Sequence, residues 1–88
     1  MAGCARPILD VAAGNLLMML AMHQDRPCPT NPEIREWTGV SRRRLAPWLA
    51  GLQARGIVEI GREGLAGRRR MRAVGGVWTG WSARGYGR

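Results

Sequence analysis

The chain has 88 residues and a formal net charge of +8. One domain of this size buries about 60–65% of its surface on folding, which leaves little room for an enclosed active site. Hydrophobic residues make up 45% of the chain and include four tryptophans and five methionines. This composition excludes a disordered polypeptide and predicts a packed core.

The positive charge is concentrated in the second half of the chain, and every basic residue is arginine. Residues 1–40 hold three arginines and four acidic residues, whereas residues 41–88 hold eleven arginines and two acidic residues. A basic half predicts a polyanionic partner, and the forked guanidinium suits phosphate groups or guanine edges. A GC-rich genome would explain the choice of arginine over lysine, but not its clustering after Ser41.

Few residues are suited to catalysis, metal binding or membrane insertion. Cys4, Cys28 and His23 form no plausible zinc site, and without a secretory signal we expect both thiols to be reduced. The apolar run at residues 15–22 is too short to span a bilayer. We therefore expect a cytoplasmic, nucleoid-associated protein that is not an enzyme and binds no cofactor, metal or membrane.

A first helix is predicted from Ile8 to His23, after a flexible N-terminus of residues 1–7, with Asp10 as a candidate cap. Apolar residues recur along it at three- and four-residue spacing: Ile8, Ala12, Leu16, Met19 and Leu20. Three more widen the apolar surface: Leu17, Met18 and Met22. This wider surface is either buried in the core or a contact with a partner, such as a second copy of the chain.

A second, short helix is predicted to begin near Thr30. Thr30 and Glu33 match a capping box, and Asn31 followed by Pro32 matches an alternative cap at almost the same place. Gly39 is expected to end this helix in the left-handed conformation. Two of its apolar residues are expected to face inward: Ile34 and Trp37.

A third helix is predicted between Ser41, its natural N-cap, and Gly56. Its buried stripe consists of Leu45, Leu49 and Leu52, with Trp48 at the margin. The opposite face holds Arg43, Ala46, Pro47 and Ala50, flanked by Arg42 and Arg44. Because Pro47 would delete a hydrogen bond, the helix either begins one or two residues after Ser41 or bends at Pro47.

The remainder predicts a β-hairpin. A strand at residues 57–60 and a second at residues 68–74 flank a loop at residues 61–67, and Gly75-Gly76 ends the hairpin. Residues 77–81 either add a short strand or tuck their two indoles against the core, and residues 82–88 form a flexible basic tail. The predicted fold class is α+β: three helices and a two- or three-stranded hairpin in one domain at residues 8–81.

This order of elements is typical of a winged helix-turn-helix, in which one helix holds another in the major groove of DNA. Such a fold is matched by Pro29, Thr30, Glu33, Ile34, Gly39, Val40, Ser41, Leu45, Leu49, Leu52 and residues 56–60. Through these positions, residues 29–60 resemble the DNA-binding domain of the bacterial SOS repressor. They also resemble the winged-helix domains of the multiple-antibiotic-resistance regulators, and small phage and prophage regulators carry the same pattern.

The resemblance implies sequence-specific binding of double-stranded DNA, with the third helix in the major groove. By this analogy the base-reading residues would be Ser41, Arg42, Arg43, Ala46 and Pro47. The chain departs from such repressors in placing arginines first and small or apolar residues after them. The self-cleaving protease domain of the SOS repressor has no counterpart here. We therefore expect a transcription regulator, a repressor of bacterial or phage type.

The arginines are expected to divide the contacts. Arg43 projects opposite the leucine stripe and suits a bidentate guanine contact, whereas Arg42 and Arg44 suit phosphates. The predicted contacts of the hairpin are Arg68, Arg69, Arg70 and Arg72. Strand alternation places Arg70 and Arg72 on one face and Arg69 on the other, so not all of them can touch DNA.

Two other functions fit the same residues. One is a non-specific or architectural nucleic-acid binder, for which affinity would depend on salt but not on sequence. The other is a winged-helix adaptor that binds a protein. Contacts for such a partner, or for a homodimer, would come from Leu17, Met18 and Met22 or from Trp78 and Trp81. Helical spacing favours the core for Trp37 and Trp48 over stacking on unpaired bases.

Overall fold

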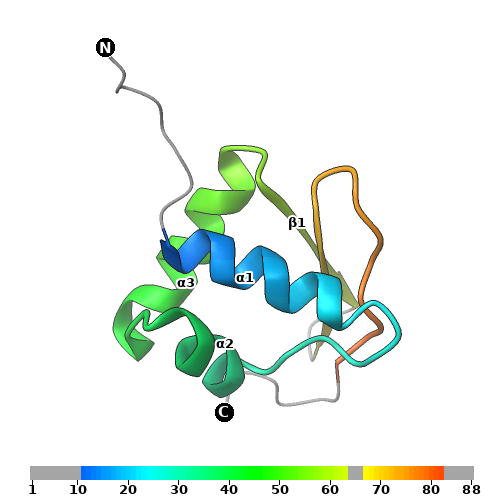
Figure 1. Cartoon of the computed structure of the whole chain (residues 1–88), viewed down its shortest axis with the longest axis horizontal. Coiled ribbons are helices and arrows are strands. Elements are labelled where there is room, and N and C mark those ends of the chain that lie inside the picture. Colours follow the sequence, from blue (N-terminus) through cyan, green and yellow to red (C-terminus); the bar gives the residue numbers. More distant parts are fainter. Residues whose placement is uncertain (1–10, 64–66, 83–88) are drawn as a thin grey trace.

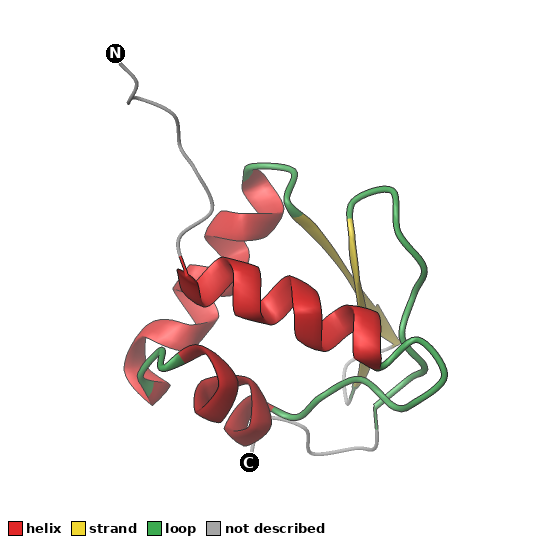
Figure 2. Ribbon diagram, in the orientation of Figure 1, coloured by secondary structure: helices red, strands yellow, loops and turns green. Residues whose placement is uncertain are grey.

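The computed structural model describes residues 11–63 and 67–82. Its elements are α1 (Val11–Met22), α2 (Asn31–Thr38), α3 (Arg42–Ala54), β1 (Val58–Glu63) and β2 (Arg68–Ala73) (Figure 1). The strands pair antiparallel in the register Val58 to Ala73 and Glu63 to Arg68. Figure 2 shows the three helices gathered together, with the hairpin beside them. The described chain is thus α+β, and its arrangement is compatible with a winged helix.

The core lies where the helices meet one face of the hairpin. α1 contacts α2 and β2, and α3 contacts α2 and β1. The buried hydrophobic residues come from all five elements and from the α1–α2 loop: Ala13, Leu16, Met19, Leu20, Cys28, Ile34, Leu45, Leu49, Leu52, Val58 and Met71. The leucine stripe predicted for α3 is therefore confirmed as core.

Helix α1 follows the prediction with two differences. It ends at Met22, one residue earlier than expected, and Ala13 rather than Ala12 joins the core. The predicted start at Ile8, the cap at Asp10 and the flexible N-terminus lie outside the described residues. Within residues 11–63 and 67–82, no helix has the length and apolar character needed to cross a membrane.

Helix α2 is bounded by the signals in its own sequence. Thr30 is the N-cap: its backbone N–H donates to Glu33 Oε1 at 2.8 Å, and the Glu33 N–H donates to Thr30 Oγ1 at 3.3 Å. Gly39 follows the helix at φ 76°, and its N–H donates to the Arg35 carbonyl at 2.8 Å. The capping-box alternative is therefore correct, with Asn31 as the first helical residue.

We expect Thr30→Ala to lower the free energy of unfolding by about 1 kcal/mol in urea titrations, because the cap hydrogen bond is lost.

Hydrogen bonds from the backbone and side chain of Thr30 hold the pKa of Glu33 below its ordinary value. The ionised form of Glu33 therefore stabilises the fold at neutral pH, and this contribution is lost as the pH falls through the lowered pKa. Glu33→Gln should make stability less sensitive to acid; an effect no larger than that of Glu36→Gln would contradict the prediction.

Helix α3 begins at Arg42, one residue after Ser41. Ser41 occupies the N-cap position with φ −70° and ψ 158°, but its side chain makes no capping hydrogen bond. Pro47 lies inside the helix. The helix is closed by Gly56 at φ 73° and by the Ile57 N–H, which donates to the Leu52 carbonyl at 2.9 Å.

The hairpin extends further than predicted. β1 begins at Val58, one residue later than predicted, and continues through residues 61–63, which the sequence predicts as loop. Residues 64–66 lie outside the described structure. β2 begins at Arg68 as predicted and ends at Ala73, one residue early. The longer first strand brings Arg62 into register opposite Arg69.

The segment after the hairpin lies along the outer edge of β2. Thr79 N–H donates to the Met71 carbonyl at 2.9 Å, and Ser82 N–H donates to the Arg69 carbonyl at 2.7 Å. In return, the Thr79 and Ser82 hydroxyls accept from the N–H groups of Met71 and Arg69, at 3.1 and 2.8 Å. Ser82 is buried, so assigning it to a flexible tail was wrong; residues 83–88 lie outside the described structure.

The same segment is joined to the α1–α2 loop at Gly80. Its N–H donates to the Arg26 carbonyl at 2.9 Å, and its carbonyl accepts from the Cys28 N–H at 3.0 Å. A Cβ on Gly80 would lie 3.2 Å from the Arg26 oxygen, so this close approach favours glycine. The segment is thereby held between β2 and the loop.

Candidate nucleic-acid interface

The residues predicted to read bases lie together at the exposed start of α3. Ser41, Arg42, Arg43, Ala46 and Pro47 are all exposed, and so is Arg44. The leucine stripe on the other side of the helix is buried in the core, where α3 contacts α2 and β1. The start of α3 therefore presents three guanidinium groups to solvent, from a helix anchored along its opposite face.

The arginines of α3 point to different sides of the helix. Arg44 lines a depression of about 290 Å³ with Trp48, Ala12 and the α2–α3 turn. Arg42 and Arg43 are not among the described residues of that depression. Helical periodicity places Arg42 on the same side as Ala46 and Gln53, which face the hairpin.

The hairpin carries its arginines on both faces, as strand alternation predicts. Arg68, Arg70 and Arg72 lie on the outer face, and Arg69 lies on the inner face with Met71. Arg68 is 3.7 Å from Glu63, and Arg72 is 2.7 Å from Glu59. Of the outer arginines, Arg72 is thus the one most tightly bound to an acidic residue.

The two indoles of the last segment lie on the outer face of the hairpin, so the alternative that placed them against the core is wrong. The Arg70 guanidinium carbon is 4.3 Å from the Trp78 ring centroid and 4.8 Å from that of Trp81. The Arg72 carbon is 4.6 Å from the Trp78 centroid. Gly61 lies beneath this stack, where a Cβ would be 3.3 Å from Arg70 Cγ. Cation–π contacts therefore hold Trp78 and Trp81 against the arginines.

Arg69 does not belong to the exposed basic surface. It is 2% exposed, and it donates to Asn31 Oδ1 at 2.8 Å and to the Pro29 carbonyl at 2.9 Å. These bonds join β2 to the start of α2. Of the predicted DNA contacts on the hairpin, Arg69 is the buried one, because its inward direction on the strand places it where backbone and amide oxygens accept from the guanidinium.

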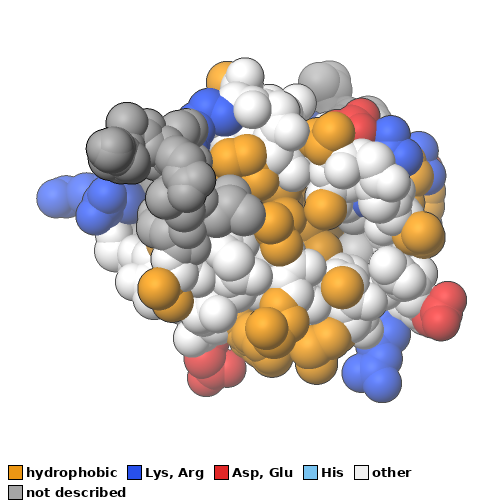
Figure 3. All heavy atoms as spheres, turned by 45° about the horizontal axis from the view of Figure 1, so that its top comes forward, with side chains coloured by type: hydrophobic (Ala, Val, Ile, Leu, Met, Phe, Trp, Pro, Cys, Tyr) orange, Lys and Arg blue, Asp and Glu red, His pale blue; other side chains and the backbone are white. Residues whose placement is uncertain are grey.

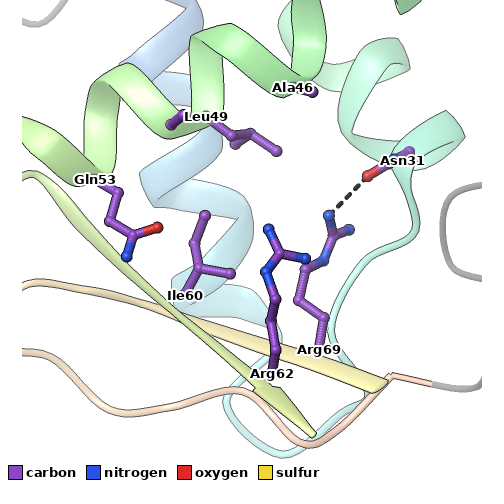
Figure 4. A pocket seen from close by; sticks show the side chains of 8 residues that line it. Asn31, Ala46, Leu49, Gln53, Ile60, Arg62 and Arg69 are labelled. Atoms are coloured by element: carbon purple, nitrogen blue, oxygen red, sulfur yellow. Dashed lines mark hydrogen bonds between the residues drawn. The ribbon is translucent and has the colours of Figure 1, made fainter. Parts of the chain in front are cut away.

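A pocket of about 190 Å³ separates α3 from the hairpin (Figure 4). It is lined by Asn31, Ala46, Leu49, Ala50, Gln53, Ile60, Arg62 and Arg69. In Figure 4 the side chains of Arg62 and Arg69 rise side by side from the hairpin toward the helices. The sequence interpretation missed Arg62 because it placed this residue in a loop. The signal that was available is the period of two shared by Val58, Ile60 and Arg62.

The surfaces considered for a partner are partly exposed. Met18 and Met22 are 57% and 55% exposed, whereas Leu17 packs against the core. Trp37 is 38% exposed and is not a core residue as predicted, whereas Trp48 does pack against the core. Figure 3 shows hydrophobic side chains in the middle of one face, with arginines toward its edges.

We find no family whose model matches this sequence, and no curated protein or solved structure with significant similarity to it. Among residues 11–63 and 67–82, no group of three or more histidine, cysteine or acidic side chains could hold a metal ion. Burial raises the pKa of the Cys28 thiol, which keeps it protonated in the core.

Proposed function

We propose that this chain is a winged helix-turn-helix protein that binds double-stranded DNA with sequence specificity and regulates transcription, as a repressor of bacterial or phage type. The observation that carries the proposal is the exposed start of α3. Residues 41–44 are exposed there, and three leucines on the opposite side of the helix are buried in the core. A helix held in this way has the shape and charge needed to enter a major groove.

In the proposed complex, the outward side of α3 faces the bases. Arg43 supplies a bidentate contact to guanine, and Arg42 and Arg44 contact the flanking phosphates. The hairpin acts as the wing, and Arg68 and Arg70 add backbone contacts. These phosphate contacts contribute affinity for any sequence, so specificity depends on the few residues that reach base edges.

The test is a binding selection from a random double-stranded DNA pool at about 150 mM salt, followed by sequencing of the retained fraction. Enrichment of one motif is expected. A palindromic motif would indicate a dimer, with half-sites about 10 base pairs apart or a multiple of that spacing. The exposed methionines of α1 or the Trp78–Trp81 surface would then be candidates for the dimer contact. A reporter promoter carrying the motif should fall in expression when the protein is present.

Two outcomes would contradict this proposal. Retention of DNA without enrichment would indicate a non-specific or architectural binder, whose affinity depends on salt alone. No retention would indicate an adaptor that binds a protein.

A further inference from the structure

Two arginines face each other across the inner side of the hairpin. Arg62 and Arg69 are cross-strand partners, and both line the pocket below α3. Arg69 is 2% exposed, whereas Arg62 is exposed. An anion in the pocket would be attracted by both guanidinium groups.

The walls of the pocket suit a small anion. The sides formed by α3 and β1 are mostly apolar: Ala46, Leu49, Ala50 and Ile60. None of the described lining residues is acidic, and Asn31 and Gln53 add polar amide groups. An electrostatic contact is stronger beside such walls than in open water, because the local dielectric constant is lower.

The size of the pocket separates two classes of ligand. Its volume of about 190 Å³ is below the roughly 300–1,000 Å³ typical of sites for drug-sized molecules. It is several times the roughly 30 Å³ that one water occupies in the liquid. A single phosphate group with some hydration therefore fits the pocket better than a nucleotide or another larger effector.

We propose that this pocket is a phosphate subsite, which takes one backbone phosphodiester of the bound duplex between α3 and the hairpin. Arg69 is held in place by Pro29 and Asn31 and supplies positive charge, whereas the more exposed Arg62 supplies direct N–H donors. This inference rests on the proposed DNA binding. A contact of this kind fixes the register of α3 in the groove without reading a base.

The position of the pocket agrees with that role. Arg42 lies on the same side of α3 as Ala46 and Gln53, which line the pocket. A DNA strand that passes Arg42 at the rim of the major groove would continue toward Arg62. The phosphate in the pocket would thus lie on the strand that the start of α3 also contacts.

The first test compares Arg62→Gln with Arg55→Gln on the duplex enriched by selection. Arg55 is an exposed arginine that directly follows α3 and is not among the described lining residues. Arg55→Gln therefore removes the same charge as Arg62→Gln, but away from the pocket. Arg62→Gln is expected to weaken binding about 5- to 10-fold at about 150 mM salt and to reduce the salt slope by about one. Arg55→Gln should change neither quantity. Equal effects of the two variants would overturn the pocket proposal.

The second test replaces single phosphates of that duplex with neutral methylphosphonates. For the unmodified protein, one position per half-site should weaken binding by a similar factor, and Arg62→Gln should show no further loss there. If the losses from Arg62→Gln and from every methylphosphonate multiply independently, the pocket proposal fails while the proposed function stands.

If the unmodified protein retains no DNA, the proposed function fails and the pocket is tested with inorganic phosphate by amide NMR. Saturable shifts at Ala46, Ala50 and Arg62, absent in Arg62→Gln, would support a subsite for free phosphate. The absence of such shifts in the unmodified protein would overturn the pocket proposal as well.

Discussion

Arg43→Ala is expected to lower the affinity for the duplex enriched by selection by about one to two orders of magnitude. A bidentate contact between arginine and guanine contributes about 1–3 kcal/mol of discrimination against other bases. Arg43 is exposed and lies on α3 opposite the buried leucines. Its removal should therefore affect base recognition and leave the fold unchanged.

The measurement is a pair of titrations, one with the enriched duplex and one with a scrambled duplex of the same length. For Arg43→Ala, affinity for the scrambled duplex should fall only by the small factor that comes from losing one positive charge. The control Arg55→Ala should alter neither titration strongly. Circular dichroism and the urea midpoint should match the unmodified protein. If Arg43→Ala weakens both duplexes by the same factor, Arg43 contacts phosphate, and another residue reads the bases.

Arg69→Ala is expected to lower the free energy of unfolding by about 3 kcal/mol, the largest stability effect that we predict. The substitution removes the donors that reach the Pro29 carbonyl and Asn31 Oδ1. A buried acceptor left without its charged donor costs about 1–3 kcal/mol, and the emptied volume adds a cavity term. The anchor between β2 and the start of α2 is lost with it.

Urea denaturation of Arg69→Ala and Arg68→Ala provides a matched comparison. The two residues are neighbours on β2, but Arg68 is exposed on the outer face and pairs loosely with Glu63. Arg68→Ala should change stability by less than about 0.5 kcal/mol. An unfolding free energy of Arg69→Ala equal to that of the unmodified protein would contradict this prediction.

Much of the fold is determined by short-range features of the sequence. Thr30 and Glu33 lie three residues apart, and Gly39 and Gly56 end α2 and α3 through bonds within one turn. Leu45, Leu49 and Leu52 face the core because their spacing matches the helix repeat. Such signals need no knowledge of distant contacts. For that reason the ends of α2, the start of β2 and the exposed arginines of α3 could all be predicted.

Only the tertiary structure decided the roles of the arginines of the hairpin. Strand alternation places Arg69 and Arg70 on opposite faces of the hairpin, but it does not say which face packs on the helices. Because arginine side chains are rarely buried, composition gave no reason to expect Arg69 in the core. The answer depends on Pro29 and Asn31, which lie about 40 residues earlier in the chain. Likewise, Ser82 is buried because it bonds to β2, and Trp78 lies on the outer face because its ring contacts the guanidinium groups of Arg70 and Arg72. Contacts across such distances leave no local pattern, so the phosphate-sized pocket between Arg62 and α3 becomes visible only once the chain is folded.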